Sequence, residues 1–232
     1  MRAEDFEHAR NLPFFEGVGD GPVESLLRGA FLQRFPAQVE LVREGEQADF
    51  LHVIVEGQVE LFSAYRERET TVGVFGPGQS FIAAAVLLDR RYLKSARTLT
   101  ATRVLMLPSD AVRASFAADA AFARALAIEL AVSYRYLVKE LKNQKLRSNL
   151  ERLANWLLVR DTETGLTGKF ELPFDKKVLA AWLGMAPEVL SRSFAALAAY
   201  KVVVQGPRIE FSDAEALRNL AQPSETIDDP AV

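Results

Sequence analysis

Three polar side chains between residues 187 and 198 share one face of a predicted helix. Glu188, Ser191 and Arg192 are spaced three and four residues apart, so they project from the same side of that helix. An arginine guanidinium can donate two parallel hydrogen bonds to O6 and N7 of guanine, and a carboxylate can accept one from N4 of cytosine. The spacing also fits an ordinary exposed ion pair, but as a set these side chains could recognise base edges in a major groove.

The segments around this helix have the layout of a helix-turn-helix followed by a β-ribbon. Residues 178–182 predict a first helix, which meets the second at Gly184, where the turn needs a residue that tolerates a positive φ. Pro187 suits the first turn of the second helix, where its missing N–H costs no hydrogen bond. Residues 201–204 and 208–211 then predict two strands joined by a tight turn. This order is the winged-helix arrangement, whose second helix reads DNA.

The distribution of charge supports the same interpretation more weakly. The chain has a net charge of −3, whereas residues 145–211 hold ten basic and seven acidic side chains. A locally basic segment favours nucleic-acid binding, although this excess is small. Lys176 and Lys177 precede the first helix of the motif and are expected to meet DNA phosphates. As surface lysines they could equally be solvated.

The composition excludes several classes of chemistry. The chain of 232 residues contains no cysteine, which excludes disulfides, thiolate catalysis and cysteine-ligated metal sites. It has two histidines and no Gly-rich phosphate loop, HExxH or GxSxG motif, so we do not expect an enzyme. No apolar run is long enough to span a membrane, and the N-terminus lacks the apolar core of a signal peptide. The sequence therefore predicts a cytoplasmic protein without a membrane partner.

Residues 35–107 are organised as short strand-like runs separated by turn residues. The runs are residues 39–42, 50–55, 58–62, 71–75 and 102–107. Residues 50–62 form the clearest hairpin, with the turn at Gly57. Several short strands at this spacing predict a sandwich or a barrel.

A long helix without Gly or Pro is predicted for Asp119–Lys145, and it has two apolar faces. The first face alternates in steps of three and four residues and predicts a dimer seam made of Ala127, Leu130, Tyr134, Leu137 and Leu141. The second face is expected to pack on the strand-rich half and consists of Ile128, Ala131, Val132 and Val138. A helix buried within one subunit is the alternative. Ser148 is expected to cap the next helix, residues 150–159, and to mark a hinge.

Two stretches of the strand-rich half resemble a known family. LVREGEQADFLHVIVEGQVELF, followed by VFGPGQSF, resembles the cyclic-nucleotide-binding β-roll. With the later helix-turn-helix and wing, the chain resembles the CRP/FNR superfamily of bacterial transcription regulators over roughly residues 12–220. The resemblance implies an α+β fold with a jelly-roll-like β-roll, a long dimerisation helix and a winged helix-turn-helix. It also implies a homodimer that binds a palindromic operator in double-stranded DNA, responds to an effector in the roll and contacts RNA polymerase.

The resemblance also places boundaries along the chain. Residues 1–118 are expected to form the effector-sensing β-roll, 119–147 the dimerisation helix and hinge, 148–221 the DNA-binding domain, and 222–232 a flexible tail. The Glu-x-x-Ser-Arg pattern at Glu188 to Arg192 is similar to that of the FNR-like branch, whose half-sites resemble TTGAT. Pro187 replaces a polar residue of the cyclic AMP branch, so the outer base of the half-site stays open.

The expected effector pocket departs from the pattern of family members that bind cyclic AMP. Those members carry a Gly-Glu pair and a later Arg-Ser/Thr-Ala run, in which Glu takes the ribose hydroxyl and Arg takes the cyclic phosphate. Here Gln79 replaces the Glu and Lys94 replaces the Arg, so we do not expect cyclic AMP to bind. Leu137 and Val138 are expected to face the adenine, and neither has a side chain that can hydrogen bond to it. The expected pocket residues are Gly78, Gln79, Phe81, Lys94, Ser95, Arg97, Leu137 and Val138.

Three alternatives to cyclic AMP stay open. The apolar segment 80–93 resembles the Dnr branch, which senses nitric oxide through haem, and a carbon monoxide sensor would need the same cofactor. An axial haem ligand would be His8 or His52, although His52 is expected at the surface or on an edge strand. The absence of cysteine excludes the oxygen-sensing FNR branch. An apolar or aromatic acid held by Arg97 or Lys94 is the second alternative, and regulation without any effector is the third. A sensor acting only through protein partners would need no DNA.

Overall fold

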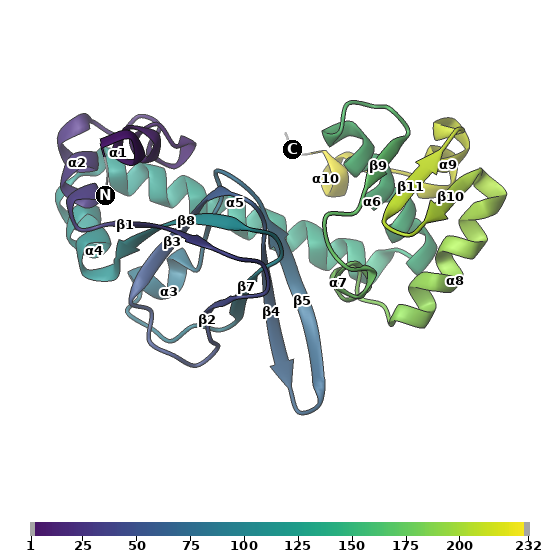
Figure 1. The fold of residues 1–232 in the computed structure, drawn as a ribbon, viewed down its shortest axis with the longest axis horizontal. Coiled ribbons are helices and arrows are strands. Elements are labelled where there is room, and N and C mark those ends of the chain that lie inside the picture. The colour runs from purple at the N-terminus through teal and green to yellow at the C-terminus, as the bar shows by residue number, and fades with distance from the viewer. Residues whose placement is uncertain (1–2, 230–232) are drawn as a thin grey trace. The chain divides into compact units, whose positions relative to one another are not determined.

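A computed structural model describes residues 3–229 of the chain, which form two compact units (Figure 1). The first unit ends at Tyr134 and the second begins at Arg135, within one continuous helix. The α+β fold class is confirmed, with an N-terminal β-roll, a long helix and a C-terminal helix-turn-helix unit. None of the helices described is long and apolar enough to cross a membrane.

The first unit contains two four-stranded antiparallel sheets, with strand orders β1-β8-β3-β6 and β2-β7-β4-β5. The strands are β1 (Phe31–Phe35), β2 (Glu40–Val42), β3 (Phe50–Glu56), β4 (Val59–Tyr65), β5 (Arg68–Phe75), β6 (Ser80–Phe81), β7 (Ser95–Thr98) and β8 (Thr102–Pro108). Leu51, Leu61 and Leu105 are buried in one core between the sheets. Five strands follow the predicted runs, whereas β1, β6 and β7 have no counterpart among them.

Short helices complete the first unit. They are α1 (Ala3–Arg10), the 3-10 turn η1 (Pro13–Phe15), α2 (Asp20–Arg28), α3 (Ala83–Leu87) and α4 (Ser109–Ala118). The N-terminal helices have no counterpart in the sequence prediction. Phe14 is buried and its ring lies 6.2 Å from that of Phe122, so the N-terminal segment packs into the same core.

The predicted hairpin between β3 and β4 is present, and its turn requires glycine. Gly57 has a φ of 86°, and a Cβ there would lie 2.5 Å from the carbonyl oxygen of Ala101 and from Oγ1 of Thr102. Any side chain would therefore be strained by its backbone conformation and would also clash with the adjacent loop.

The predicted long helix is α5 (Ala120–Leu146). Phe122 and Leu126 are buried in the core of the roll, and Leu130 packs against it. The second apolar face does not pack on the roll as expected. It lies on the side of α5 opposite to Phe122, Leu126 and Leu130, which repeat every four residues and contact the roll. Its residues are all exposed: Ile128, Ala131, Val132 and Val138. Apart from Leu130, the predicted seam is exposed as well: Ala127, Tyr134, Leu137 and Leu141. The alternative of a helix buried within one subunit is therefore wrong for this stretch.

The second unit packs helices around a small sheet of order β10-β11-β9. Its elements after α5 are α6 (Asn149–Glu163), β9 (Lys169–Glu171), α7 (Lys176–Trp182), α8 (Pro187–Leu197), η2 (Ala198–Tyr200), β10 (Val202–Gln205), β11 (Arg208–Phe211), α9 (Ala214–Ala221) and α10 (Glu225–Asp228). Leu157, Leu179 and Ile209 are fully buried in its core. The predicted cap is present: the Ser148 hydroxyl accepts from the Glu151 amide, and the Glu151 side chain accepts from the Ser148 amide.

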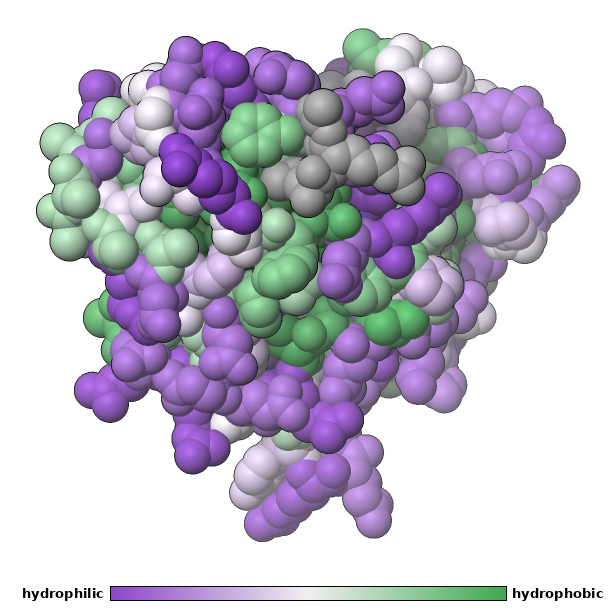
Figure 2. Space-filling view, turned by 60° about the vertical axis from the view of Figure 1, so that its left-hand side comes forward, coloured by the Kyte–Doolittle hydropathy of each residue, from purple (hydrophilic) through white to green (hydrophobic). Residues whose placement is uncertain are grey.

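Exposed apolar side chains are not confined to α5. Leu88 and Leu93 of the roll are 69% and 84% exposed. The face drawn in Figure 2 is mostly hydrophilic and carries a hydrophobic patch near its middle. Exposure alone therefore does not identify a dimer seam on this chain, whereas the regular spacing of apolar residues along α5 favours one.

Candidate nucleic-acid interface and effector pocket

Helix α8 divides its residues between support and an exposed face. Leu190, Phe194 and Leu197 are buried in the core of the second unit. Glu188, Ser191 and Arg192 are all exposed on the opposite side. Pro187 occupies the first turn, where the sequence places it. The buried stripe fixes the rotation of α8 about its axis, so the three polar side chains share one solvent-facing surface.

The two lysines expected before the first helix are the first two residues of α7, and they lie beside α8. A shallow pocket of about 240 Å³ is lined by Lys176, Lys177, Pro187, Leu190, Ser191, Phe194 and Val204. The Lys176 ammonium lies 5.7 Å from the centre of the Phe194 ring, close enough for a cation–π contact. The structure thus brings Lys176, Lys177, Pro187 and Ser191 to one hollow, which is the placement that a phosphate-contacting edge beside a recognition helix needs.

The predicted ribbon is the pair β10 and β11, which turns at Gly206 with a φ of 60°. Its third strand, β9, pairs with β11 and has no counterpart among the strands predicted from the sequence. Glu210 of the ribbon accepts from Lys169 at 3.1 Å and from Arg208 at 2.5 Å. These hydrogen bonds hold the pKa of Glu210 below its usual value. Two cations of the wing are thus already paired within the sheet.

A buried arginine, missed by sequence reasoning, ties the helix-turn-helix to the end of α5. Arg152 of α6 is 7% exposed, and its Nε donates to the carbonyl of Leu183 in the turn at 2.8 Å. Its Nη1 donates to the carbonyls of Gln144 at 3.2 Å and Arg147 at 2.8 Å. The carbonyl end of a helix carries partial negative charge, so a cation is favoured there. Arg152 therefore joins α5, α6 and the turn before α8.

Two further contacts fasten the same turn to α5. The Trp182 indole donates to the Tyr136 hydroxyl at 3.2 Å. Gly184 has a φ of 65°, and a Cβ there would lie 3.3 Å from the Gln144 side chain. Glycine thus satisfies the backbone conformation predicted for this turn and leaves room for α5 to pack closely against it.

In the effector pocket, Arg97 is not free to hold a ligand. Its Nε lies 2.6 Å from Glu60 and its Nη2 lies 2.8 Å from Glu69. The guanidinium carbon lies 4.2 Å from the centre of the Phe62 ring. Glu60 is 1% exposed and also accepts a hydrogen bond from Thr71 at 2.5 Å. Because a ligand would have to displace this shielded ion pair, the structure does not support Arg97 as a counter-ion.

Other predicted pocket residues use their polar groups within the fold. The Gln79 side chain accepts from the amide of Gly76 at 2.7 Å, inside its own turn, and Gly78 donates to the carbonyl of Ile54. The Ser95 hydroxyl accepts from the amide of Glu44 at 2.9 Å. Leu137 and Val138, also predicted for the pocket, belong to the second unit and are exposed on α5.

Lys94 is the one predicted pocket cation that the structure leaves available. Burial lowers the pKa of its ammonium, and among the residues described no carboxylate offsets this effect. A half-buried cation without a compensating charge gains from an anionic ligand.

The apolar segment that follows Gln79 is connected to α5. Ser80 donates to Glu129 of α5 through its amide at 3.1 Å and through its hydroxyl at 2.7 Å. Ile82 precedes α3 with a φ of 70°, in the left-handed region that a β-branched residue rarely adopts. Strained backbone of this kind clusters at functional sites. Sequence patterns revealed neither feature, because the Ser80 contact joins residues 49 positions apart.

Neither predicted haem ligand has the surroundings that haem needs. His8 is exposed on α1. The prediction of a surface or edge position for His52 is wrong, because His52 lies within β3 between β8 and β6 and is 2% exposed. Its ring is stacked on Phe81 with centroids 5.0 Å apart. An axial ligand must face the haem iron, and the His52 ring is instead packed against Phe81 in the interior of the roll. Within residues 3–229, no cluster of His, Asp and Glu could hold a metal ion.

Comparison with protein-family models matches two parts of the chain. Residues 32–119 match the cyclic nucleotide-binding domain, and residues 151–220 match the Crp-like helix-turn-helix domain. The first match covers the strands of the roll and the second covers α6 to α9. A comparison with curated protein sequences found no match.

Solved structures resemble nearly the whole chain. A candidate cAMP-binding regulatory protein from Silicibacter pomeroyi DSS-3 is 30% identical, covers 94% of this chain and 98% of its own, and has a TM-score of 0.62. FixK2 from Bradyrhizobium japonicum is 21% identical over 84% of this chain and 98% of its own, with a TM-score of 0.74. The Catabolite Activator Protein of Thermus thermophilus is 25% identical over 90% and 98%, with a TM-score of 0.50.

Proposed function

Because the chain belongs to the CRP/FNR family of transcription regulators, we propose that it acts as a homodimer on a palindromic operator, under the control of an effector other than cyclic AMP. The observation that carries the DNA-reading part is the exposed face of α8, where Glu188, Ser191 and Arg192 stand on a buried support. In this proposal Arg192 reads guanine, Glu188 reads cytosine, and Lys176 and Lys177 contact phosphates. The protein would act in the cytoplasm, with RNA polymerase as its partner at a promoter.

Replacing Arg192 with alanine should weaken binding to the operator selectively. Loss of a bidentate base contact should reduce affinity for the palindrome by about 1–3 kcal/mol, roughly 5- to 150-fold. Affinity for scrambled DNA should hardly change, because the phosphate contacts remain. The measurement is a pair of titrations at one salt concentration, on a palindrome selected from random duplexes by the unmodified protein and on its scrambled form.

Arg218→Ala is the matched control, since Arg218 is an exposed arginine on α9 and not on α8. It should leave both affinities unchanged. If Arg192→Ala weakens both DNA fragments by the same factor, Arg192 is a phosphate contact and its base-reading role is refuted.

Dimerisation through α5 is supported by the exposed seam of that helix. Leu137 and Leu141 are 46% and 55% exposed, one helical turn apart on the same face. A second copy of α5 would cover them and place one recognition helix in each half-site.

The effector proposal rests on the polar groups around Gln79 and Lys94. Arg97 is engaged by two carboxylates and the Gln79 side chain is bonded within its own turn, so neither is free to hold a cyclic phosphate or a ribose. Lys94 remains as a counter-ion for an acid with an apolar body. The bond between Ser80 and Glu129 would carry a change in this segment to α5.

Cyclic AMP should therefore give no saturable heat in a calorimetric titration at micromolar protein. The reason is that the pocket offers one lysine where the nucleotide needs a bidentate cation and a carboxylate. Lys94→Ala serves as the control, and its titration curve should be indistinguishable from that of the unmodified protein. Micromolar affinity of the unmodified protein for cyclic AMP would contradict this part of the proposal, whether or not Lys94→Ala removes it.

A further inference from the structure

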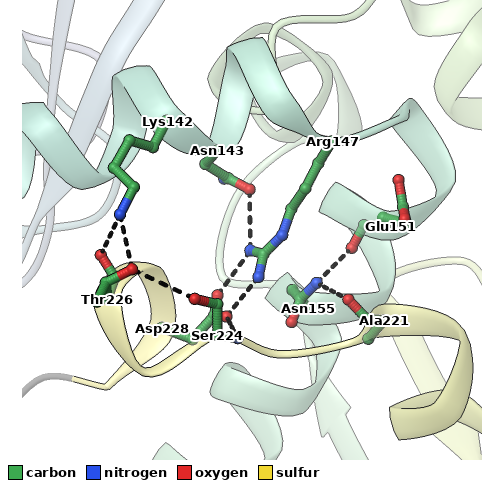
Figure 3. A network of polar contacts seen from close by, with 9 residues as sticks. All are labelled: Lys142, Asn143, Arg147, Glu151, Asn155, Ala221, Ser224, Thr226 and Asp228. Atoms are coloured by element: carbon green, nitrogen blue, oxygen red, sulfur yellow. Dashed lines mark hydrogen bonds and ion pairs between the residues drawn. The ribbon is translucent and has the colours of Figure 1, made fainter.

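The C-terminal segment after α9 contacts Lys142 of α5 and Arg147, which lies at the corner between α5 and α6 (Figure 3). Residues 222–229, here called the C-terminal strap, lie beyond residue 220, where the match to the Crp-like helix-turn-helix domain ends. They were expected to be a flexible tail but include helix α10. We propose that the strap fixes the angle between α5 and α6, and that Arg147 and Asp228 are thereby positioning residues for operator binding. This inference rests on the proposed DNA-binding function.

The central contact of the strap is a shielded ion pair at the corner between the two helices. Arg147 lies between the last residue of α5 and the Ser148 cap of α6. Its guanidinium donates to both carboxylate oxygens of Asp228, at 2.7 and 2.5 Å. The two side chains are 7% and 16% exposed. A two-bond pair fixes direction as well as distance, and burial protects it from screening by salt.

Asp228 and its neighbours also hold α10 in place. The Asp228 carboxylate accepts from the amide of Ser224 at 2.7 Å, which closes the first turn of the strap. Lys142 of α5 donates to the hydroxyl of Thr226 at 2.7 Å and to its carbonyl at 3.2 Å. Figure 3 shows Lys142 and Arg147 reaching from α5 and its end toward the strap. The strap is therefore bonded to α5 at more than one point.

The strap begins directly after α9, and the last residue of α9 is bonded to α6. The Asn155 side chain donates to the carbonyl of Ala221, the last residue of α9, at 2.6 Å and to that of Glu151 at 2.9 Å. Asn155 is 4% exposed, so loss of either acceptor would leave a buried donor unpaired. The chain thus forms a closed circuit from α5 through α6 and α9 to the strap and back to α5. The α5–α6 angle cannot change while these contacts persist.

The same corner determines where α8 stands. Arg152 joins the carbonyl end of α5 to Leu183, four residues before α8 begins. With Arg152 holding this turn to α5 and the strap closing the α5–α6 corner, α8 keeps one setting relative to α5. In a dimer formed through α5, that setting determines the separation of the two recognition helices and hence the half-site spacing that both can bind.

The first test measures hydrogen exchange in the full-length protein. Asp228→Asn removes the negative charge of the ion pair while keeping the size of the side chain. Hydrogen exchange of the backbone amides of residues 146–152 should then become roughly tenfold faster. A chain ending at Gln222 should show at least the same change. Glu225→Gln is the matched control, because Glu225 is an exposed carboxylate on the strap itself. If hydrogen exchange is unchanged in both the substituted and the shortened chain, the proposal that the strap fixes the corner between α5 and α6 is overturned.

The second test uses palindromes selected by the unmodified protein, rebuilt with one base pair added to or removed from the spacer. The unmodified protein and Glu225→Gln should prefer the selected spacing strongly. In Asp228→Asn, the ratio of affinities for the selected and the altered spacing should fall about tenfold, while the affinity for a single half-site stays the same. A merely structural role would weaken every fragment alike. Faster exchange with an unchanged spacing preference overturns the positioning role. If the unmodified protein selects no palindrome, the proposed function itself fails, and the exchange measurement still decides whether the strap holds the corner.

Discussion

Leu137→Glu combined with Leu141→Glu should convert the protein from dimer to monomer. Both leucines are exposed on α5 of a single chain, at 46% and 55%, and the a/d spacing places them in the proposed seam. Each glutamate would face its symmetry mate in a desolvated contact, and burying an unpaired charge costs several kcal/mol. Sedimentation velocity at micromolar protein should show the monomer mass. Leu130 is left unchanged, because it also packs against the core of the roll.

The loss of the dimer should carry over to DNA. Two linked recognition helices bind a palindrome with an avidity about 10²–10⁴-fold above that of either alone, and the monomer should lose that factor. Leu166→Glu is the matched control, since Leu166 is a 69% exposed leucine outside α5. It should sediment as a dimer and bind the palindrome normally. A doubly substituted protein that still sediments as a dimer would refute the seam.

His52 should make the folded protein sensitive to mildly acidic pH. Burial lowers the pKa of its imidazole from 6.5 to about 4, outweighing the opposite effect of the nearby Phe50 backbone. Above pH 6.5 the side chain is neutral whether the protein is folded or unfolded, and its contribution to stability is fully present. As the pH falls from 6.5 toward 4, the unfolded chain takes up a proton that the folded chain does not, so stability is lost. The loss attributable to His52 should approach about 3 kcal/mol.

The measurement is the free energy of unfolding by urea at a series of pH values from 7.5 to about 4, a range set by the two pKa values of His52. His52→Leu removes the titrating group and should flatten this part of the curve, leaving the slope due to carboxylates. His8→Gln is the control, because His8 is exposed on α1 and should leave the slope intact. Equal slopes in His52→Leu and the unmodified protein would show that the imidazole is not held neutral by the fold.

Local patterns in the sequence predicted those parts of the fold that depend on neighbouring residues. The helix-turn-helix is set by an apolar stripe, a glycine with positive φ and a proline in the first turn, all within about 20 residues. The Ser148 cap and the Gly57 hairpin are equally local. The short strands β6 and β7, which have two and four residues, give too little periodicity to be recognised.

The errors concern partners that are distant in the sequence. Arg97 was expected beside a ligand, but its ion-pair partners come from β4 and β5, 37 and 28 residues away. The alternation of side chains along β3 places His52 on the opposite face from Leu51 and Val53. It does not show that both faces of this strand are buried. The pairing of Asp228 with Arg147 spans 81 residues. The expectation of a flexible tail is wrong for residues 222–229, because no local pattern reveals a carboxylate that meets a cation elsewhere in the unit.

In α8, the residues that support the helix and those proposed to contact bases occupy separate faces. This separation has a consequence for how such regulators diverge. The residues that would touch bases are solvent-exposed, while those that hold the helix are buried, and no position among them does both. Exposed substitutions usually change stability by less than about 0.5 kcal/mol. A duplicated gene could therefore acquire a new set of target promoters through a few surface replacements, with folding, dimerisation and effector response inherited intact. If α8 reads the operator as proposed, transplanting Pro187, Glu188, Ser191 and Arg192 as a group should transfer the operator preference of one family member to another.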